Sequence, residues 1–484
     1  MSIALLAVLV PLLAAIPLAL AGSATSASYF NLALNAVTFA LTLGVGFSPG
    51  TGMLHADHLG IIFGILSGFV GFTTSINNIG FIKSEQGRKS IRRWRLYHAM
   101  CQVMLGTTLL GLYADNIGLL WVAVEGATIS ATLGVSLSRT ASALEAAWKY
   151  FILGGVGIAL ALFGIMLTYL AAQPALGPGI AAMSFNALTQ HAAQLDGSLM
   201  TLAFVFLLFG FGTKAALVPL HGWLPDAYAE GPIPLTATLS VLLLNVGLLA
   251  LLRFRHLMSA NAAAGAGAMH PGPFLLILGL ASLFLTGFSL WRRRDSRRFF
   301  GFSSIEHSGI AIFAFGIGGP AIIFGGLLHM LLHTLLKSAL FQALTKAALA
   351  RGSAAPGNYG FSHLRGMIAT NKHLGWLLVI CIFALTGLPP SGLFTSEYLI
   401  ISQTIIRDPY YSLPLGAGLL LCAIAIIRQV GPVGFAPAPA SAKPQKAGAD
   451  IITIYAHLIL VLLLAFAMPV ALVTLLSHIA DTLQ

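Results

Sequence analysis

The sequence predicts an all-α polytopic membrane protein with about fourteen transmembrane helices. Of its 484 residues, 57% are hydrophobic and only 8% are charged, whereas an ordinary globular domain has about 25% charged residues. Apolar stretches of roughly the 20 residues that a spanning helix requires recur along almost the whole chain. These stretches lack the strict apolar–polar alternation of a membrane barrel. Helices, which satisfy their own backbone hydrogen bonds in lipid, are therefore expected.

The predicted helices follow one another from the first residues to the last. They span residues 3–21, 30–47, 57–82, 98–113, 115–136, 147–172, 198–219, 234–254, 274–291, 301–318, 321–348, 374–405, 411–429 and 451–477. The first helix resembles a secretory signal peptide, but it lacks a positively charged start, and we expect it to be retained. Pro219 in the seventh helix and Pro389–Pro390 in the twelfth should break these two helices, because proline removes a helical hydrogen bond.

Four regions are expected along the chain. Residues 1–97 hold three helices and a basic loop, residues 98–256 and 257–430 hold five helices each, and residues 431–484 hold a Pro/Ala-rich linker and the last helix. Each five-helix region contains a proline-broken helix with one ionisable residue near the break, Lys214 or Glu397. This pattern suggests two inverted repeats, the fourth to eighth helices against the ninth to thirteenth. The Ala/Gly-rich stretch 256–273 is expected to be a flexible loop.

The net charge of +11 does not indicate nucleic-acid binding, because the basic residues collect in short loops. These loops all follow odd-numbered predicted helices, and their basic residues are Lys83, Arg88, Lys89, Arg92, Arg93, Arg95, Arg292, Arg293, Arg294, Arg297, Arg298, Lys346, Arg351, Arg365, Lys372, Lys443 and Lys446. The positive-inside rule makes this side cytoplasmic and places both termini outside. Arg253, Arg255 and Arg407 fall on the other side. The expected location is the inner (cytoplasmic) membrane.

The three cysteines indicate no cofactor in this chain. Cys101, Cys381 and Cys422 each lie in an apolar run, and no CxxC or Cys/His cluster accompanies them. Disulfides, structural zinc and iron–sulfur clusters are therefore not expected. No segment outside the membrane is long enough for its own core, so chemistry on a soluble substrate is expected of other subunits.

Ionisable residues inside the predicted helices are the candidates for function, because each costs a few kcal/mol in lipid. Lys214 lies deep in its segment, and burial favours a neutral amine that can release a proton. A lysine snorkelling from a helix end is the alternative. Glu125 lies mid-helix and must be paired or protonated, with Lys214 as its expected partner. A static ion pair that only fixes helix packing is the alternative for Glu125.

A polar file is expected in HMLLHTLLKSALF. His329, His333 and Lys337 follow at i, i+4 and i+8 and share one helix face. This face suits a proton relay, because histidine titrates near neutral pH. The histidine spacing also fits a metal site, but the motif has no carboxylate and Lys337 would repel a cation, so no metal is expected. Core histidines bound to carbonyls are a further alternative. Glu306 and His307 either join this line or lie at the cytoplasmic end of their helix.

Four motifs resemble a known family. The family is that of the antiporter-like proton-pumping subunits of respiratory complex I and Mrp antiporters. Its motifs of helices 7–8, 10, 11 and 12 are similar, in this order, to FGFGTKAALVPLHGWLPDAYAEGPIP, RRDSRRFFGFSSIEHSGI, HMLLHTLLKSALF and GLPPSGLFTSEYLI. ALEAAWKYFIL and SSIEHSGI particularly resemble component F of hydrogenase-4 and related membrane-bound nickel–iron hydrogenases. The resemblance covers the fourth to thirteenth helices.

The resemblance implies fourteen helices, two inverted repeats and a central hydrophilic axis. It gives Glu125 the place of the helix 5 glutamate, Lys214 that of the helix 7 lysine and Glu397 that of the helix 12 ionisable residue. The helix 11 connection is then formed by His329, His333 and Lys337. Possible accessory residues are His221, Asn245, Glu306, His307 and Arg428.

Two positions depart from the family pattern. Asn245 stands where complex I subunits often carry a lysine, so a relay from Lys214 to helix 11 needs water or a histidine there. Arg297 stands in place of a lysine before helix 10.

The expected function is proton translocation by an antiporter-like, non-catalytic membrane subunit of a complex I-related, hydrogenase-type oxidoreductase complex. Its expected partners are other membrane subunits, a soluble redox module and the lipid bilayer. A change in Glu125–Lys214 pairing would displace a proton toward helix 11 and Glu397. The alternatives are an Mrp-type cation/proton antiporter subunit, the membrane subunit of an inorganic-carbon uptake complex, and a scaffold whose charges only lock helices together.

Overall fold

The structure is a computed structural model that describes residues 1–85, 90–352, 359–439 and 451–483. Its helices are α1 (Ile3–Leu20), α2 (Ala24–Gly44), α3 (His58–Glu85), α4 (Ile91–Tyr113), α5 (Ile117–Ser136), α6 (Ala141–Leu176), α7 (Phe185–Gln190), α8 (Gly197–Lys214), α9 (Trp223–Glu230), α10 (Ile233–Ala263), α11 (Gly272–Leu290), α12 (Ser296–Ile317), α13 (Pro320–Ala350), α14 (Met367–Thr370), α15 (Lys372–Ala384), α16 (Gly392–Arg407), α17 (Ser412–Ile427), α18 (Val430–Phe435), α19 (Ile452–Phe466) and α20 (Val470–Thr482). A two-stranded antiparallel ribbon, β1 (Gly50–Thr51) with β2 (Leu54–His55), follows α2.

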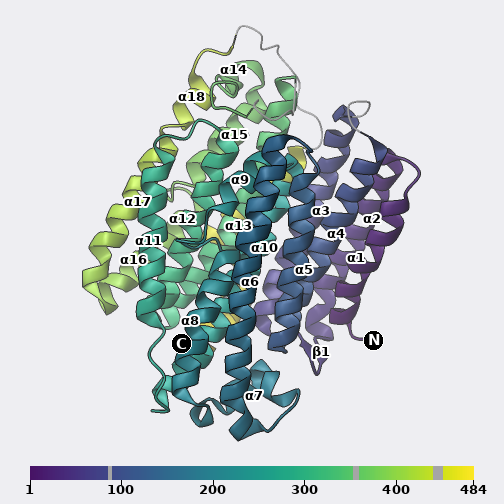
Figure 1. The fold of residues 1–484 in the computed structure, drawn as a ribbon. Helices are drawn as coiled ribbons and strands as arrows, with labels where there is room; N and C mark the ends of the chain where they lie inside the picture. Colours follow the sequence, from purple (N-terminus) through teal and green to yellow (C-terminus); the bar gives the residue numbers. More distant parts are fainter. Residues whose placement is uncertain (86–89, 353–358, 440–450, 484) are drawn as a thin grey trace.

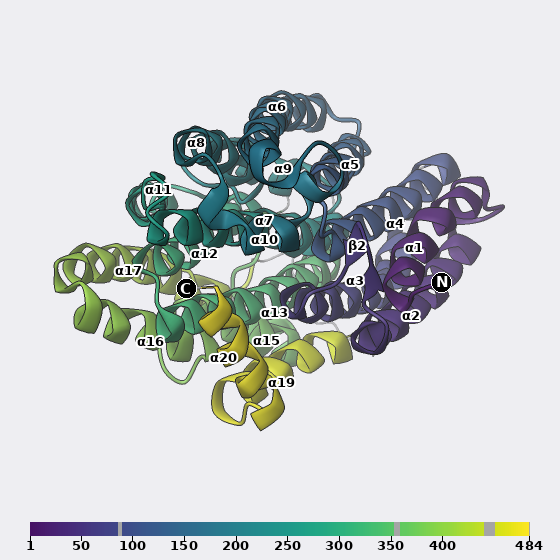
Figure 2. The ribbon, with the colours of Figure 1, turned by 90° about the horizontal axis from the view of Figure 1, so that it is seen from below.

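The long helices run side by side in one bundle (Figure 1). Seen along the bundle, α10, α12 and α13 occupy the middle, with α1, α2 and α4 at one end and α16 and α17 at the other (Figure 2). Every residue in the most apolar stretch of α10 is buried, whereas α1, α2 and α17 leave most of theirs open. α10 and α13 carry apolar residues on every face because each is surrounded by other helices on all sides.

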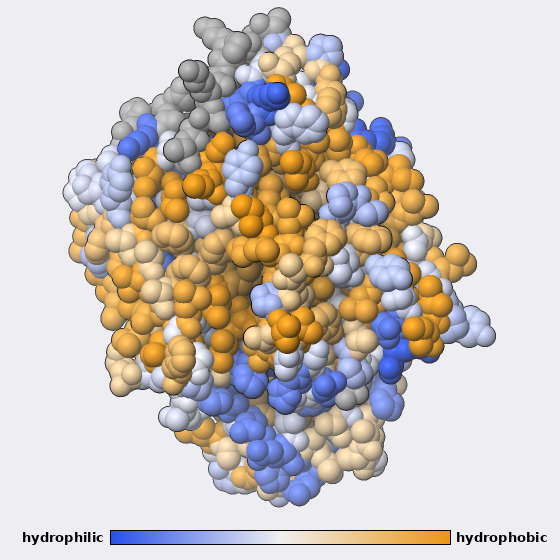
Figure 3. Space-filling view, turned by 180° about the vertical axis from the view of Figure 1, so that it is seen from behind, coloured by the Kyte–Doolittle hydropathy of each residue, from blue (hydrophilic) through white to orange (hydrophobic). Residues whose placement is uncertain are grey.

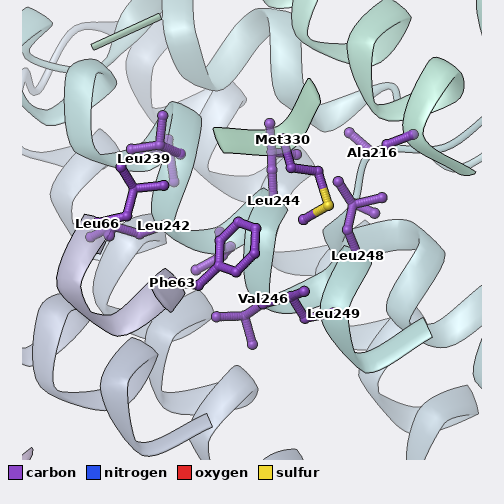
Figure 4. Packing of buried hydrophobic residues seen from close by; sticks show 14 of the residues in the cluster. Phe63, Leu66, Ala216, Leu239, Leu242, Leu244, Val246, Leu248, Leu249 and Met330 are labelled. Atoms are coloured by element: carbon purple, nitrogen blue, oxygen red, sulfur yellow. The ribbon is translucent and has the colours of Figure 1, made fainter. Parts of the chain in front are cut away.

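The core is formed where α10 packs against its neighbours. Phe63 of α3, Leu244 of α10 and Met330 of α13 lie in this layer (Figure 4). The face of the bundle seen in Figure 3 is mostly apolar across its middle, with hydrophilic patches toward the lower end and beside the upper end. An apolar belt of this kind is what lipid would cover.

The predicted class, an all-α polytopic membrane protein, is confirmed. In the described residues, eleven helices are long and apolar enough to cross a membrane, and the bent pair α19–α20 would make a twelfth. Two further predicted spans, 98–113 and 374–405, are helical but fall short of that measure. His98, Gln102 and Tyr113 lower the hydropathy of α4, and the second span is divided into α15, which has only 13 residues, and α16. The count of fourteen, the four regions and the inverted repeats stay predictions.

The two predicted breaks are present. α8 ends at Lys214 and α9 begins at Trp223, and α15 ends at Ala384 before α16 begins at Gly392. The single helix predicted over 451–477 is wrong: α19 and α20 meet at 71°. Pro469 caps α20 there, and it cannot donate the backbone hydrogen bond that a continuous helix needs.

Two predicted loops are partly helical. The stretch 256–273 begins as helix because α10 continues to Ala263, where Asn261 donates to the carbonyls of Ala192 (2.7 Å) and Leu195 (2.9 Å). The basic loop after α3 is shorter than predicted, because α4 starts at Ile91 and takes in Arg92, Arg93 and Arg95. Arg88, Lys89, Lys443 and Lys446 lie outside the described residues.

Candidate functional site

Lys214 is the last residue of α8, and it is fully buried. Its Nζ donates a hydrogen bond to the carbonyl oxygen of Gly154 on α6 at 3.0 Å. Glycines make this close approach possible, because a Cβ at Gly157 would collide with Thr213 and one at Gly247 would lie 2.8 Å from the backbone nitrogen of Ala215. The break in α8 therefore sits in a tightly packed cage formed by α6 and α10.

The backbone turns directly after Lys214. Ala216 has a φ of 55°, in the left-handed region that residues with a Cβ rarely adopt. Beyond the turn, the indole nitrogen of Trp223 donates to the Thr213 carbonyl at 2.8 Å. This bond satisfies one of the carbonyls that the end of α8 leaves without a helical partner.

Glu125 of α5 lies near Lys214 without the direct ion pair that the sequence predicts. The two charges act on each other, but no ion pair within 4 Å joins these two described residues. The reason is that the amine of Lys214 is turned to the Gly154 carbonyl. The buried Oε2 of Glu125 has no hydrogen-bond partner in the protein.

A histidine cluster lies in the other half of the bundle. His307 Nδ1 of α12 is 3.1 Å from His329 Nε2 of α13, and His329 Nδ1 is 3.0 Å from Ser396 Oγ of α16. The ring of His333 lies 4.6 Å from that of His307. His307 therefore joins the line that the i, i+4 spacing on α13 predicts.

Glu397 completes this cluster. Its carboxylate and the ring nitrogens of His307 and His329 lie within 4.8 Å of one another, and all three residues are buried. The motif that holds His329 and His333 contains no carboxylate, and the fold brings Glu397 to His329 from α16. By geometry these three residues suit a metal ion as well as proton exchange. That the chain holds no metal stays a prediction.

Lys337 and Glu306 lie one step further along α13 and α12. Lys337 Nζ donates to the Phe300 carbonyl at 2.8 Å. Glu306 is 3% exposed, so it belongs to the interior rather than to the membrane surface. Its charge acts on that of Lys337 without an ion pair. Both halves thus contain a buried lysine bound to a backbone carbonyl and a glutamate standing close to it.

Two connections run between the halves. Asn245 of α10 donates to Thr334 Oγ1 of α13 at 2.8 Å. The second connection is α9, where Tyr150 of α6 stacks on Trp223 at 4.1 Å and Tyr228 packs edge-on against Phe341 of α13 at 5.5 Å. Tyr150 and Tyr228 were not predicted. Tyr228 lies in the short helix that follows a predicted break, but no sequence pattern connects it with Tyr150 on α6.

Ion pairs hold α9 between the two halves. Lys149 of α6 lies 3.2 Å from Asp226, and Arg298 of α12 lies 3.3 Å from Asp226 and 3.0 Å from Glu230. Arg297 donates to the Gly231 carbonyl at 3.0 Å. Since α9 carries Tyr228, this network positions the connection between the clusters.

Many buried polar atoms along this line have no hydrogen-bond partner in the protein. They include Glu125 Oε2, the hydroxyls of Tyr150 and Tyr228, Glu306 Oε2, His307 Nε2 and His333 Nε2. Leaving such an atom unpaired costs about 1–3 kcal/mol. A row of them is therefore a place where water is stabilised.

The remaining predicted residues lie outside the clusters. His221 is half-buried beside Phe302, with its ring 6.5 Å from that ring. Arg428 is exposed and lies over the Trp291 ring at 4.6 Å, so the structure does not bring it to the buried line.

Comparison with known proteins places these features in context. The family described as NADH:quinone oxidoreductase/Mrp antiporter, transmembrane, matches residues 114–425. The chain is 41% identical to the hydrogenase-4 component F homolog of Methylacidiphilum infernorum over 482 residues, 99% of each chain.

Two solved structures are similar in fold. One is a chain of the membrane-bound sulfane sulfur reductase, an archaeal respiratory complex, with a TM-score of 0.86, 20% identity and coverage of 100% of this chain and 98% of that chain. The other is a chain of the Mrp complex from Dietzia, with a TM-score of 0.82, 17% identity and coverage of 98% and 96%.

Proposed function

The chain belongs to the NADH:quinone oxidoreductase/Mrp antiporter transmembrane family, and from this membership we propose that it translocates protons as a subunit of a hydrogenase-type, complex I-related redox complex. Other membrane subunits and a soluble redox module are its partners, and the chain itself holds no redox cofactor. It resides in the inner membrane with its basic loops in the cytoplasm and both termini outside. The 41% identity to the hydrogenase-4 component F homolog over the full length supports the hydrogenase type.

The observation that carries the proposal is the buried line from Glu125 to Glu397. Between these two ends it contains two lysines, one further glutamate and three histidines, and all of the line except the half-buried Glu125 is buried in a membrane protein. Charges are retained in lipid mainly where they serve transport. A scaffold would pair them directly, whereas here no ion pair joins Glu125 to Lys214 or Glu306 to Lys337 in the described residues.

The path has three steps. A proton enters the Glu125–Lys214 pair, where a shift of the amine between the Gly154 carbonyl and Glu125 changes which group is charged. It then crosses between the halves to Lys337 and Glu306. From there it passes through the hydrogen-bonded His307 and His329 to Glu397. Histidine accepts and donates protons near neutral pH, which suits this last step.

Tyr228 is the group that we assign to the crossing. Its hydroxyl lies near Ser304 of α12 without a hydrogen bond of normal geometry, and the Tyr150 hydroxyl likewise has no hydrogen-bond partner in the protein. Asn245 cannot carry a proton as a lysine can, and it is already bound to Thr334. The two tyrosines and water therefore bridge the gap at Asn245 of α10.

We expect Tyr228→Phe to slow proton translocation by at least about tenfold, because a positioned proton-transfer group is lost. Stability should stay unchanged or rise by up to about 1 kcal/mol, because the removed hydroxyl has no protein partner. Tyr113→Phe is the matched control: it also removes a buried hydroxyl without a partner, on α4 and away from the line. Equal pumping by the two variants would remove Tyr228 from the path.

The direct test of the function uses inverted membrane vesicles that carry the parent complex. A pH-sensitive dye should report acidification of the lumen during redox turnover in sodium-free buffer, and deletion of this chain should abolish it. Pumping that requires Na⁺ would favour the Mrp-type antiporter instead. Unchanged pumping by a complex that assembles without the chain would contradict the proposal.

A further inference from the structure

A pocket at the basic end of the bundle lies apart from the buried line. It has a volume of about 650 Å³ and opens between the end of α11, the segment around Phe361 and the end of α17. Four arginines line it: Arg292, Arg293, Arg294 and Arg428. Trp291, Phe361, Ser362 and Gln429 complete the lining, which includes no carboxylate.

These arginines are not neutralised by any acidic side chain of the described residues. Within the described residues, no ion pair joins any of the four to an Asp or Glu side chain. The carboxylates of Asp226 and Glu230 pair with Arg298 and Lys149, and Asp295, which follows Arg294, accepts from the backbone N–H of Arg298 at 2.9 Å. Four like charges around one pocket repel one another, so an anion bound among them is stabilised.

Aromatic rings hold two of the guanidinium groups in place. Arg428 lies 4.6 Å from the centre of the Trp291 ring, and Arg293 lies 4.7 Å from that of Phe302. Stacking of this kind orients the plane of the guanidinium and leaves its N–H groups free to donate. Planar, preoriented N–H groups suit the oxygens of a phosphate.

The pocket continues into an apolar surface. Phe288 lies in the last turn of α11, four residues before Arg292, and Ile424 lies in the last turn of α17, four residues before Arg428. Phe288 is 69% exposed and Ile424 is 40% exposed. The two helices are packed together, because Gly287 accommodates Leu421 and Gly418 accommodates Leu283. A charged pocket thus stands at the end of an exposed apolar wall.

We propose that this pocket binds the phosphate headgroup of an anionic phospholipid whose acyl chains lie along Phe288 and Ile424. The charge complementarity requires an anion, and the apolar wall below it selects a lipid over a free anion. Basic pockets between membrane helices bind anionic lipid headgroups on this principle. The site stands whether or not the buried line translocates protons, because it shares no residue with that line.

The test compares binding of phosphatidylglycerol with that of phosphatidylcholine to the purified parent complex in detergent, measured by native mass spectrometry and by thermal stability. Wild type should retain phosphatidylglycerol and gain thermal stability from it. The double variant Arg292→Gln/Arg428→Gln should lose at least about tenfold in affinity, because two guanidinium–phosphate contacts are removed. All these side chains are exposed, so the variant should fold.

Matched controls separate the possible occupants. Arg365→Gln/Lys372→Gln makes the same change of charge at exposed positions that do not line the pocket, and it should bind as wild type does. Phe288→Ser should weaken binding of the lipid but not binding of inorganic phosphate. If millimolar inorganic phosphate stabilises the complex and phosphatidylglycerol does not, the lipid assignment is overturned in favour of a free anion. Equal lipid retention by the pocket variant and its control, or occlusion of the arginines by an acidic surface of a partner subunit, would overturn the site.

Discussion

Replacing Lys214 by methionine should abolish proton translocation while the parent complex still assembles. The amine is fully buried and has a single hydrogen bond in the protein, to the Gly154 carbonyl. Methionine fills the same space without a titratable group. Loss of a positioned proton-transfer group slows transfer by about 10²–10⁴-fold, so pumping should fall below detection.

The structure also explains why this variant should remain folded. Since no ion pair links Lys214 to Glu125, the substitution leaves no charge that was formerly in direct contact with the lysine. The substitution leaves the Gly154 carbonyl without its partner, which lowers the stability of the variant by about 1 kcal/mol. Removal of a buried amine offsets this loss. A scaffold role predicts the reverse pattern, with damaged assembly and normal coupling in whatever complex forms.

The measurement is dye-reported acidification in vesicles at matched amounts of assembled complex, with redox turnover recorded in parallel. Lys83→Met is the control, because Lys83 is an exposed lysine at the end of α3. Full pumping by assembled Lys214→Met complex would refute the path through this residue.

The sequence predicted the parts of the fold that depend on local pattern. The length of the apolar stretches predicted every long helix of the described residues. The prolines after Lys214 and before Glu397 predicted the two interior breaks. The bend between α19 and α20 was missed, although Pro469 caused it. Helix ends were missed where tertiary contacts extend a helix into a stretch with weak apolar signal, as Asn261 does for α10.

The candidate site was predicted as a set of residues but not as a geometry. Periodicity put His329 and His333 on one face, yet only the fold shows that Glu397 meets His329 and that Glu306 is interior. Lys214 was predicted as the partner of Glu125, but the sequence could not predict that the amine donates to a backbone carbonyl instead of contacting the carboxylate. Tyr228 was missed for a related reason: its position depends on where α9 lies after the break.

The second large effect is expected at a residue without a side chain. Gly387 lies between the broken halves α15 and α16 with a φ of 67°. A Cβ there would collide with the carboxylate of Glu397. Gly387→Ala should therefore displace Glu397 from His307 and His329 and lower proton translocation by at least about tenfold. The left-handed backbone adds a penalty of roughly 1–2 kcal/mol to the stability of the variant.

Two comparisons isolate the displaced carboxylate from a general loss of stability. Gly416→Ala on α17, where an added Cβ meets nothing within 4 Å, should pump as wild type does. If Gly387→Ala acts through Glu397, then adding it to Glu397→Gln should reduce pumping little further, because two changes to one interaction are not additive. Additive losses would show that Gly387→Ala does not act through Glu397, and normal pumping by Gly387→Ala would show that the place of Glu397 beside the histidines does not matter for transport.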